Sequence, residues 1–248
     1  MRRPGGREIE RWLAWGAIAA QVVFTGGWLL GDALQDAPYS AARDPISDLG
    51  ALTAQHAWVI LTAQGIAGAL TIAFAIGALR PAMAVAGRRA AIGPWLVAGS
   101  ILGLDNLSDA FFRLDCRVAD PDCAAIWIAS WHAEVHDVAA VIGVALAVAA
   151  PFALARRMRL AAAWRDRAGP ALTFGVVFAL VAAGYVALTG SDGSGYAQRA
   201  LVVIGSGGVV LLALRVRLLS RIPPTTRGSG PALRSRGGIR LSSRHPCA

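Results

Sequence analysis

The sequence predicts an all-α integral membrane protein, a bundle of six transmembrane helices with both termini in the cytoplasm. Hydrophobic residues make up 56% of the 248 residues and charged residues only 16%, whereas a soluble domain carries about a quarter charged residues. Several apolar runs approach the roughly 20 residues that a helix needs to cross a bilayer. The basic residues, all of them arginine, are concentrated in alternate connections between these runs.

The predicted spans share an apolar composition and are separated by charged or turn-forming segments. They cover residues 12–30, 57–79, 91–112, 131–155, 170–188 and 197–214. A cleaved signal peptide is the alternative for the first run, but its apolar core is longer than the roughly 7–15 residues of such peptides. We therefore divide the chain into a cytoplasmic N-terminus (1–11), a membrane domain (12–214) and a disordered, arginine-rich cytoplasmic tail (215–248).

The predicted orientation rests on where the arginines fall. All but four of the 24 lie in the two termini and in the second and fourth loops, and the exceptions are Arg43, Arg113, Arg117 and Arg199. Arginine-rich loops face the cytoplasm. Tryptophans favour membrane interfaces, and their positions agree with this orientation. The inner set is Trp12, Trp15, Trp95 and Trp164, and the outer set is Trp28, Trp58, Trp127 and Trp131.

The net charge of +9 does not indicate nucleic-acid binding. A nucleic-acid-binding domain gathers its basic residues on one folded face, and here they lie in loops and tails between apolar runs. The expected partners are membrane lipids.

Unusual polar residues gather near the predicted outer face. Asp105 lies about 20 Å along the third span, inside the hydrocarbon layer. Asp105, Ser108 and Asp109 share one helix face, and His132 and His136 share a face of the next span, so we expect the two sets to converge. The candidate cluster comprises Ser47, Asp48, His56, Asp105, Ser108, Asp109, His132, His136 and Asp137.

Two interpretations of this cluster stay open. In one, His132, His136 and Asp109, with His56 as a further ligand, hold a metal ion such as zinc for hydrolysis. In the other, carboxylate–imidazole hydrogen bonds pin the third and fourth spans together or line a binding cleft. The histidine spacing lacks the adjacent glutamate of zinc peptidases, because Glu134 lies two residues after His132, and this favours the second interpretation.

Cys116 and Cys123 enclose a short loop on the predicted outer, oxidising side, and we expect them to form a disulfide. Cys247 lies in the cytoplasmic tail and is expected to be a free thiol. The segment 45–51, with apolar residues at every third position, predicts a short helix on the membrane surface.

The chain resembles the prokaryotic membrane family known as domain of unknown function 998. The resemblance covers residues 12–214 and is carried by Tyr39, Ile46–Ala51, Arg113–Cys116, Ser130–His132 and His136–Asp137. It implies a multi-pass protein of a prokaryotic cell membrane, without an established activity.

A more distant similarity is to intramembrane hydrolases related to alkaline ceramidases, which combine one Ser, one Asp and three His. Those enzymes have seven spans, and here Ser47 and His56 lie in or beside a loop, so the similarity is an analogy only. The sequence favours binding of a lipid or small amphiphile near the outer face. A metal-dependent lipid hydrolase is the alternative, and a small-solute transporter ranks last because polar residues within the spans are sparse.

Overall fold

The computed structural model describes residues 6–123 and 129–221, and its regular elements there are helices. Five helical segments are long and apolar enough to cross a membrane. They are α1 (Gly6–Ala33), α2 (Trp58–Phe74) with its continuation through η2 (Ala75–Leu79) and α3 (Arg80–Ala82), α6 (Trp131–Leu160), η5 (Ala162–Arg167) with α7 (Ala168–Leu188), and α8 (Ser194–Arg221). The chain is therefore a multi-span membrane protein.

The predicted third span is interrupted. It consists of α4 (Gly93–Gly99), the π-helical turn η3 (Ile101–Asp105) and α5 (Asn106–Asp109). Ser100 between them has an extended backbone, with φ −74° and ψ 174°. Serine and glycine are weak helix formers, and the sequence here reads Gly99-Ser100 with Gly103 three residues later. The prediction of one continuous helix over 91–112 is therefore wrong, and five of the six predicted spans are long helices.

Gly68 of α2 explains how the interrupted segment fits into the bundle. A Cβ atom at Gly68 would lie 2.6 Å from both the Gly103 carbonyl oxygen and the Leu107 nitrogen. Such a distance is a clash, so only glycine allows the two backbones this close.

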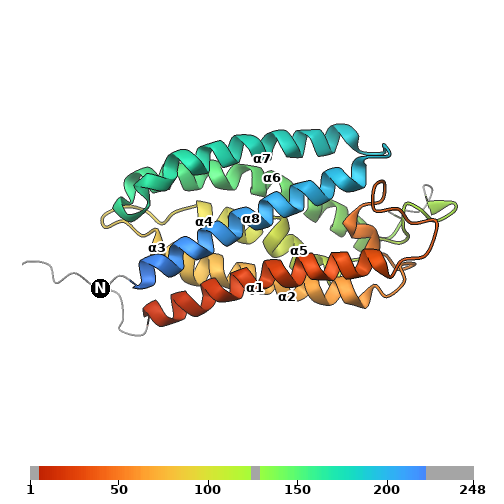
Figure 1. The fold of residues 1–248 in the computed structure, drawn as a ribbon, viewed down its shortest axis with the longest axis horizontal. Helices are drawn as coiled ribbons and strands as arrows, with labels where there is room; N and C mark the ends of the chain where they lie inside the picture. The colour runs from red at the N-terminus through yellow and green to blue at the C-terminus, as the bar shows by residue number, and fades with distance from the viewer. Residues whose placement is uncertain (1–5, 124–128, 222–248) are drawn as a thin grey trace, which may run out of the picture.

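The helices run lengthwise, with α1 beside α2 and with α7 along one edge (Figure 1). Within the most apolar stretch of the long helix Trp58–Ala82, which contains α2, 50% of the residues are buried. For the helix that contains α7 the buried share is 17%. Thus α2 is a core helix, whereas most of α7 is exposed on the outside of the bundle.

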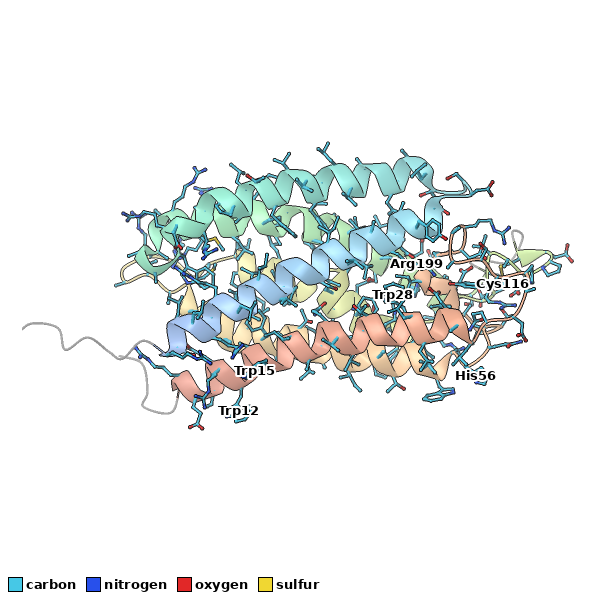
Figure 2. All side chains as sticks on the ribbon, in the orientation of Figure 1. Trp12, Trp15, Trp28, His56, Cys116 and Arg199 are labelled. Carbon is cyan, nitrogen blue, oxygen red and sulfur yellow. A yellow bond between two sulfur atoms is a disulfide. The ribbon has the colours of Figure 1, made fainter. Side chains whose placement is uncertain are left out.

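The two ends of the bundle differ in composition, because the arginine-rich segments lie at one end and the long loops at the other. The start of α1, the segment before α4, η5 and the end of α8 lie at one end, where Trp12 and Trp15 are also found. The loops containing His56 and Cys116 lie at the other end (Figure 2). We call these the arginine-rich end and the loop end. The segregation agrees with the arginine pattern, and the orientation across the membrane remains a prediction. Trp127, Cys247 and most of the predicted tail lie outside the described residues.

The short helix predicted at 45–51 is present as the 3-10 helix η1 (Ile46–Gly50). Ile46 and Leu49 are only 2% and 1% exposed and belong to the main hydrophobic core. The expected position on the membrane surface is therefore wrong: η1 is packed into the bundle, because its apolar side meets α1, α2 and α8.

Candidate functional site

Asp109 and His136 form a buried pair where α5 meets α6. The Asp109 Oδ1 atom lies 2.9 Å from His136 Nδ1. The same nitrogen lies 3.0 Å from the carbonyl oxygen of Phe112. One N–H cannot point well at both acceptors, and Oδ1 is left without a directed hydrogen bond. The second oxygen, Oδ2, accepts a hydrogen bond of 2.9 Å from Nε2 of Gln64 on α2. Three helical segments are thus joined through one carboxylate.

Asp105 lies one turn before Asp109 and is 8% exposed. Its Oδ1 atom is buried and has no hydrogen-bond partner. Gly143 lets α6 approach closely here, because a Cβ atom at this position would lie 3.0 Å from the Asp105 Cβ. The hydroxyl group of Ser108 does not donate to the Asp105 carboxylate, because it donates to the backbone oxygen of Asp105 at 2.8 Å.

A cavity of about 410 Å³ opens beside Asp105, between η3 and the first half of α6. Two carboxyl side chains, Asp105 and Glu134, contribute to its lining. The remaining lining is apolar and consists of Gly99, Leu104, Val135, Val138, Ala139, Ile142 and Leu146. We call it the Asp105 cavity. The sequence identified Asp105, but it gave Glu134 and Gln64 no role at this site.

His132 does not join the Asp109–His136 pair. Its Nδ1 atom lies 3.0 Å from the Arg113 carbonyl oxygen and 2.9 Å from Ser130 Oγ, and its Nε2 is 4.0 Å from Asp115 Oδ1. Asp115 also accepts hydrogen bonds of 2.9 Å from the backbone N–H groups of Ala129 and Ser130. Although burial acts to raise the pKa of Asp115, the hydrogen bonds from Ser130 and Ala129 bring it below its usual value. His132 and Asp115 therefore fix the start of α6.

The predicted three-ligand metal set is not assembled. Across residues 6–123 and 129–221, no group of three His, Cys, Asp or Glu side chains is placed to hold a metal ion. His56 is exposed in the loop before α2, with a positive φ of 52°. Ser47 and Asp137 are half-buried. Of the expected convergence, the structure brings together Asp105, Asp109 and His136 and directs His132 elsewhere.

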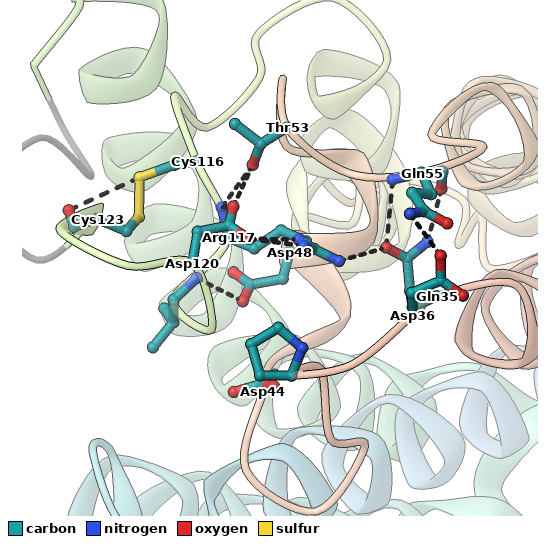
Figure 3. Close-up of polar contacts among 12 residues, drawn as sticks. Gln35, Asp36, Asp44, Asp48, Thr53, Gln55, Cys116, Arg117, Asp120 and Cys123 are labelled. Carbon is teal, nitrogen blue, oxygen red and sulfur yellow. Dashed lines mark hydrogen bonds and ion pairs between the residues drawn. A yellow bond between two sulfur atoms is a disulfide. The ribbon is translucent and has the colours of Figure 1, made fainter.

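Loops cover the loop end of the bundle and are tied together by polar contacts (Figure 3). Cys116 and Cys123 form the predicted disulfide. Arg117 is buried and donates to Asp120 at 2.6 Å and 3.0 Å and to Gln35 Oε1 at 3.1 Å. The neighbouring Arg113 donates to the carbonyl oxygens of Gly50 and Ala51 at 2.8 Å and 2.7 Å, joining the end of α5 to η1.

Asp48 belongs to this loop network rather than to the Asp105 cavity. It is 0% exposed, and its Oδ2 accepts a hydrogen bond of 2.8 Å from the Val118 backbone N–H. Its Oδ1 is buried without a partner. Burial, with Asp44 and Asp120 nearby, raises the pKa of Asp48 to about 7.

A second buried charged group, not recognised from the sequence, centres on Arg199 of α8. Its guanidinium donates to both oxygens of Asp32 at 3.1 Å and 2.6 Å, to the Tyr39 hydroxyl at 2.6 Å, and to the carbonyl oxygens of Asp44 and Gly195 at 2.9 Å and 3.0 Å. It also lies 5.7 Å from the centre of the Trp28 ring (Figure 2). The only sequence signal was an arginine just inside a predicted span.

Comparison with known proteins supports the resemblance of the sequence to a family. No curated protein and no solved structure matches the chain significantly. The model of the protein family of unknown function DUF998 matches residues 18–215, which include three of the five long helices in full, most of α1 and α8, and the Asp105 cavity. The chain therefore belongs to the DUF998 family.

Proposed function

We propose that this protein binds a lipid or small amphiphile in the Asp105 cavity, within the half of the bundle predicted to face the outer leaflet. The observation that carries the proposal is that Asp105, whose Oδ1 atom is a buried acceptor without a partner, is one of the lining residues of an otherwise mostly apolar cavity. Leaving such an atom unsatisfied costs about 1–3 kcal/mol, so a ligand that donates a hydrogen bond to it gains a specific contact.

The chemistry of the cavity favours a particular kind of head group. Asp105 and Glu134 are both acceptors when ionised, and the described residues that line the cavity include no basic side chain. An amine or hydroxyl head group complements these carboxylates, whereas a carboxylate or phosphate head group is repelled. The pair formed by Asp109 and His136 is not part of the cavity lining.

The rest of the cavity suits an apolar chain. Val135, Val138, Ile142 and Leu146 are spaced along α6 in steps of three or four residues, which places them on one helical face. Binding sites for small molecules typically combine such apolar walls with a few polar groups, in volumes of about 300–1,000 Å³. The ligand we propose therefore places its head at Asp105 and its tail along α6.

Thermal unfolding of the purified protein in detergent, with a long-chain amine, alcohol and carboxylate of equal chain length, tests this function. Ligands that bind only the folded state raise the melting temperature. We expect the amine and the alcohol to stabilise the protein more than the carboxylate. Asp105→Asn should reduce the preference for the amine over the carboxylate, because only Glu134 then remains as a carboxylate in the lining.

A pair of neighbouring substitutions tests the position of the tail. Ala139→Phe should fill the cavity and weaken the response to all three compounds, whereas Ala140→Phe adds the same bulk to a residue outside the lining. The proposal fails if none of the compounds raises the melting temperature, or if Asp105→Asn leaves the head-group preference unchanged.

A further inference from the structure

A second cavity, of about 320 Å³, lies in the arginine-rich half of the bundle and has different chemistry. It is partly open and is bordered by the second halves of α6 and α8, the first half of α7, and the region around the Ser100 break. Its lining is largely apolar and includes Leu154, Met158, Phe174, Phe178, Leu212 and Leu218. We call it the Arg167 cavity. The function proposed above makes no use of it.

A proline and two glycines shape the helices that line this cavity. Pro151 lies inside α6 and removes one helical hydrogen bond, which favours a bend at this point. On α8, Gly205 and Gly208 face Phe178 and Phe174 without side chains of their own. A Cβ atom at Gly208 would lie 2.6 Å from the Phe174 ring, so only glycine lets this ring pack so closely against α8.

The charged side chains that line this cavity are both cationic. Arg167 of η5 and Arg215 of α8 both contribute to the lining, and the side chain of Arg167 is 54% exposed. Asp166 is shared between them, at 3.2 Å from Arg167 Nε and 2.7 Å from Arg215 Nη2. Arg215 also donates to the Ala163 carbonyl oxygen at 2.6 Å, while its Nε is buried without a partner. One carboxylate between two guanidinium groups leaves an excess positive charge.

From these features we infer that the Arg167 cavity holds one acyl chain of an anionic phospholipid, with the phosphate at Arg167 and Arg215. The apolar wall suits the chain and the excess positive charge suits the head group. Guanidinium groups bind phosphate oxygens through paired hydrogen bonds. The arginine-rich end is also the end predicted to face the cytoplasm, where anionic lipid attracts basic residues.

Native mass spectrometry of the detergent-purified protein tests this inference, using phosphatidylglycerol and phosphatidylcholine with identical acyl chains. We expect phosphatidylglycerol to be retained at one molecule per protein in preference to phosphatidylcholine. Arg167→Gln should weaken that retention about fivefold, as expected for one basic residue near anionic lipid. Arg165→Gln is the matched control, because Arg165 lies in the same short helix and outside the lining.

Filling the cavity separates the acyl chain from the head group. Ala171→Phe, from the lining part of α7, should reduce retention of both lipids, and Leu172→Phe, next to it but outside the lining, should not. Equal retention of the two lipids, or no effect of Arg167→Gln, would overturn the assignment of an anionic head group. Retention unaffected by Ala171→Phe, or full replacement of the lipid by inorganic phosphate, would overturn the assignment of the chain to this cavity.

Discussion

Two buried charged groups in the same half of the bundle differ in how completely their polar atoms are satisfied. An arginine side chain has five N–H donors, and those of Arg199 make five hydrogen bonds, to Asp32, Tyr39, Asp44 and Gly195. In the group of Asp105, Asp109 and His136, by contrast, two carboxylate oxygens lack a directed hydrogen bond.

The difference separates a structural contact from a binding site. Burial, reinforced by the hydrogen bond to Asp32, raises the pKa of Tyr39 well above its usual value, so the hydroxyl stays neutral and donates to Asp32. The Arg199 guanidinium therefore has no free donor for a ligand. Its hydrogen bonds instead hold α1, α8 and the loop between α1 and η1 together. Asp105 keeps an acceptor free beside a cavity, which is the arrangement that a ligand can use.

The largest effect is expected where the satisfied group is broken. Arg199→Met should lower the free energy of unfolding by about 3–5 kcal/mol, because it leaves Asp32 as an uncompensated buried charge. Thermal unfolding in detergent measures this, with the exposed Arg165→Met as the control. If the two variants unfold at the same temperature, the Arg199 group does not have the structural role assigned to it.

Asp48, satisfied at only one oxygen, should give a pH-dependent effect. Its pKa of about 7 is above the usual carboxyl value of 3.8, so the folded protein binds more protons than the unfolded chain between these values. Stability from this group should therefore fall as pH rises from 4 to 7, by about 2–4 kcal/mol. Asp48→Asn should remove this slope and Asp122→Asn, in the exposed loop, should keep it. A wild-type slope equal to that of Asp48→Asn would contradict the prediction.

His136→Ala should have a smaller cost of about 1–3 kcal/mol, since Asp109 keeps its hydrogen bond from Gln64. Thermal unfolding with and without a chelator checks whether the pair is a hydrogen-bonded contact or part of a metal site. We expect chelation to change neither the wild type nor the variant. A wild-type melting temperature that falls on chelation, with no such response in His136→Ala, would restore the metal interpretation. His56→Ala, at an exposed position, is the control.

The smallest effect is expected at Asp105 in the absence of ligand. Because its Oδ1 has no partner to lose, Asp105→Asn should change the unfolding free energy by less than about 1 kcal/mol. Asp109→Asn, at a residue that contacts both His136 and Gln64, should cost more. The reverse order of the two variants would mean that Asp105 is the better-satisfied residue, and the comparison between the two groups would lose its basis.

The sequence predicted what depends on composition and local spacing. Long apolar runs indicated the five long helices, and the positions of Cys116 and Cys123 indicated their disulfide. Depth along neighbouring spans predicted that Asp105 and Asp109 approach the two histidines, but it set Asp109 level with His132, whereas the structure pairs Asp109 with His136. His132 was misplaced because depth alone does not fix its side-chain contacts, and the nearby Ser130, Asp115 and Arg113 carbonyl oxygen compete for its ring. The Arg199 group joins residues about 160 positions apart, and no local pattern reveals such a contact.

The break at Ser100 makes the two cavities neighbours through one short segment. Ser100 and Leu102 contribute to the Arg167 cavity, and Gly99, Leu104 and Asp105 contribute to the Asp105 cavity. A molecule that displaces this segment from one side therefore reshapes the wall on the other. If the first ligand changes the affinity for the second by some factor, the second must change the affinity for the first by the same factor. The interrupted helix would in this way act as a thermodynamic link between the two cavities.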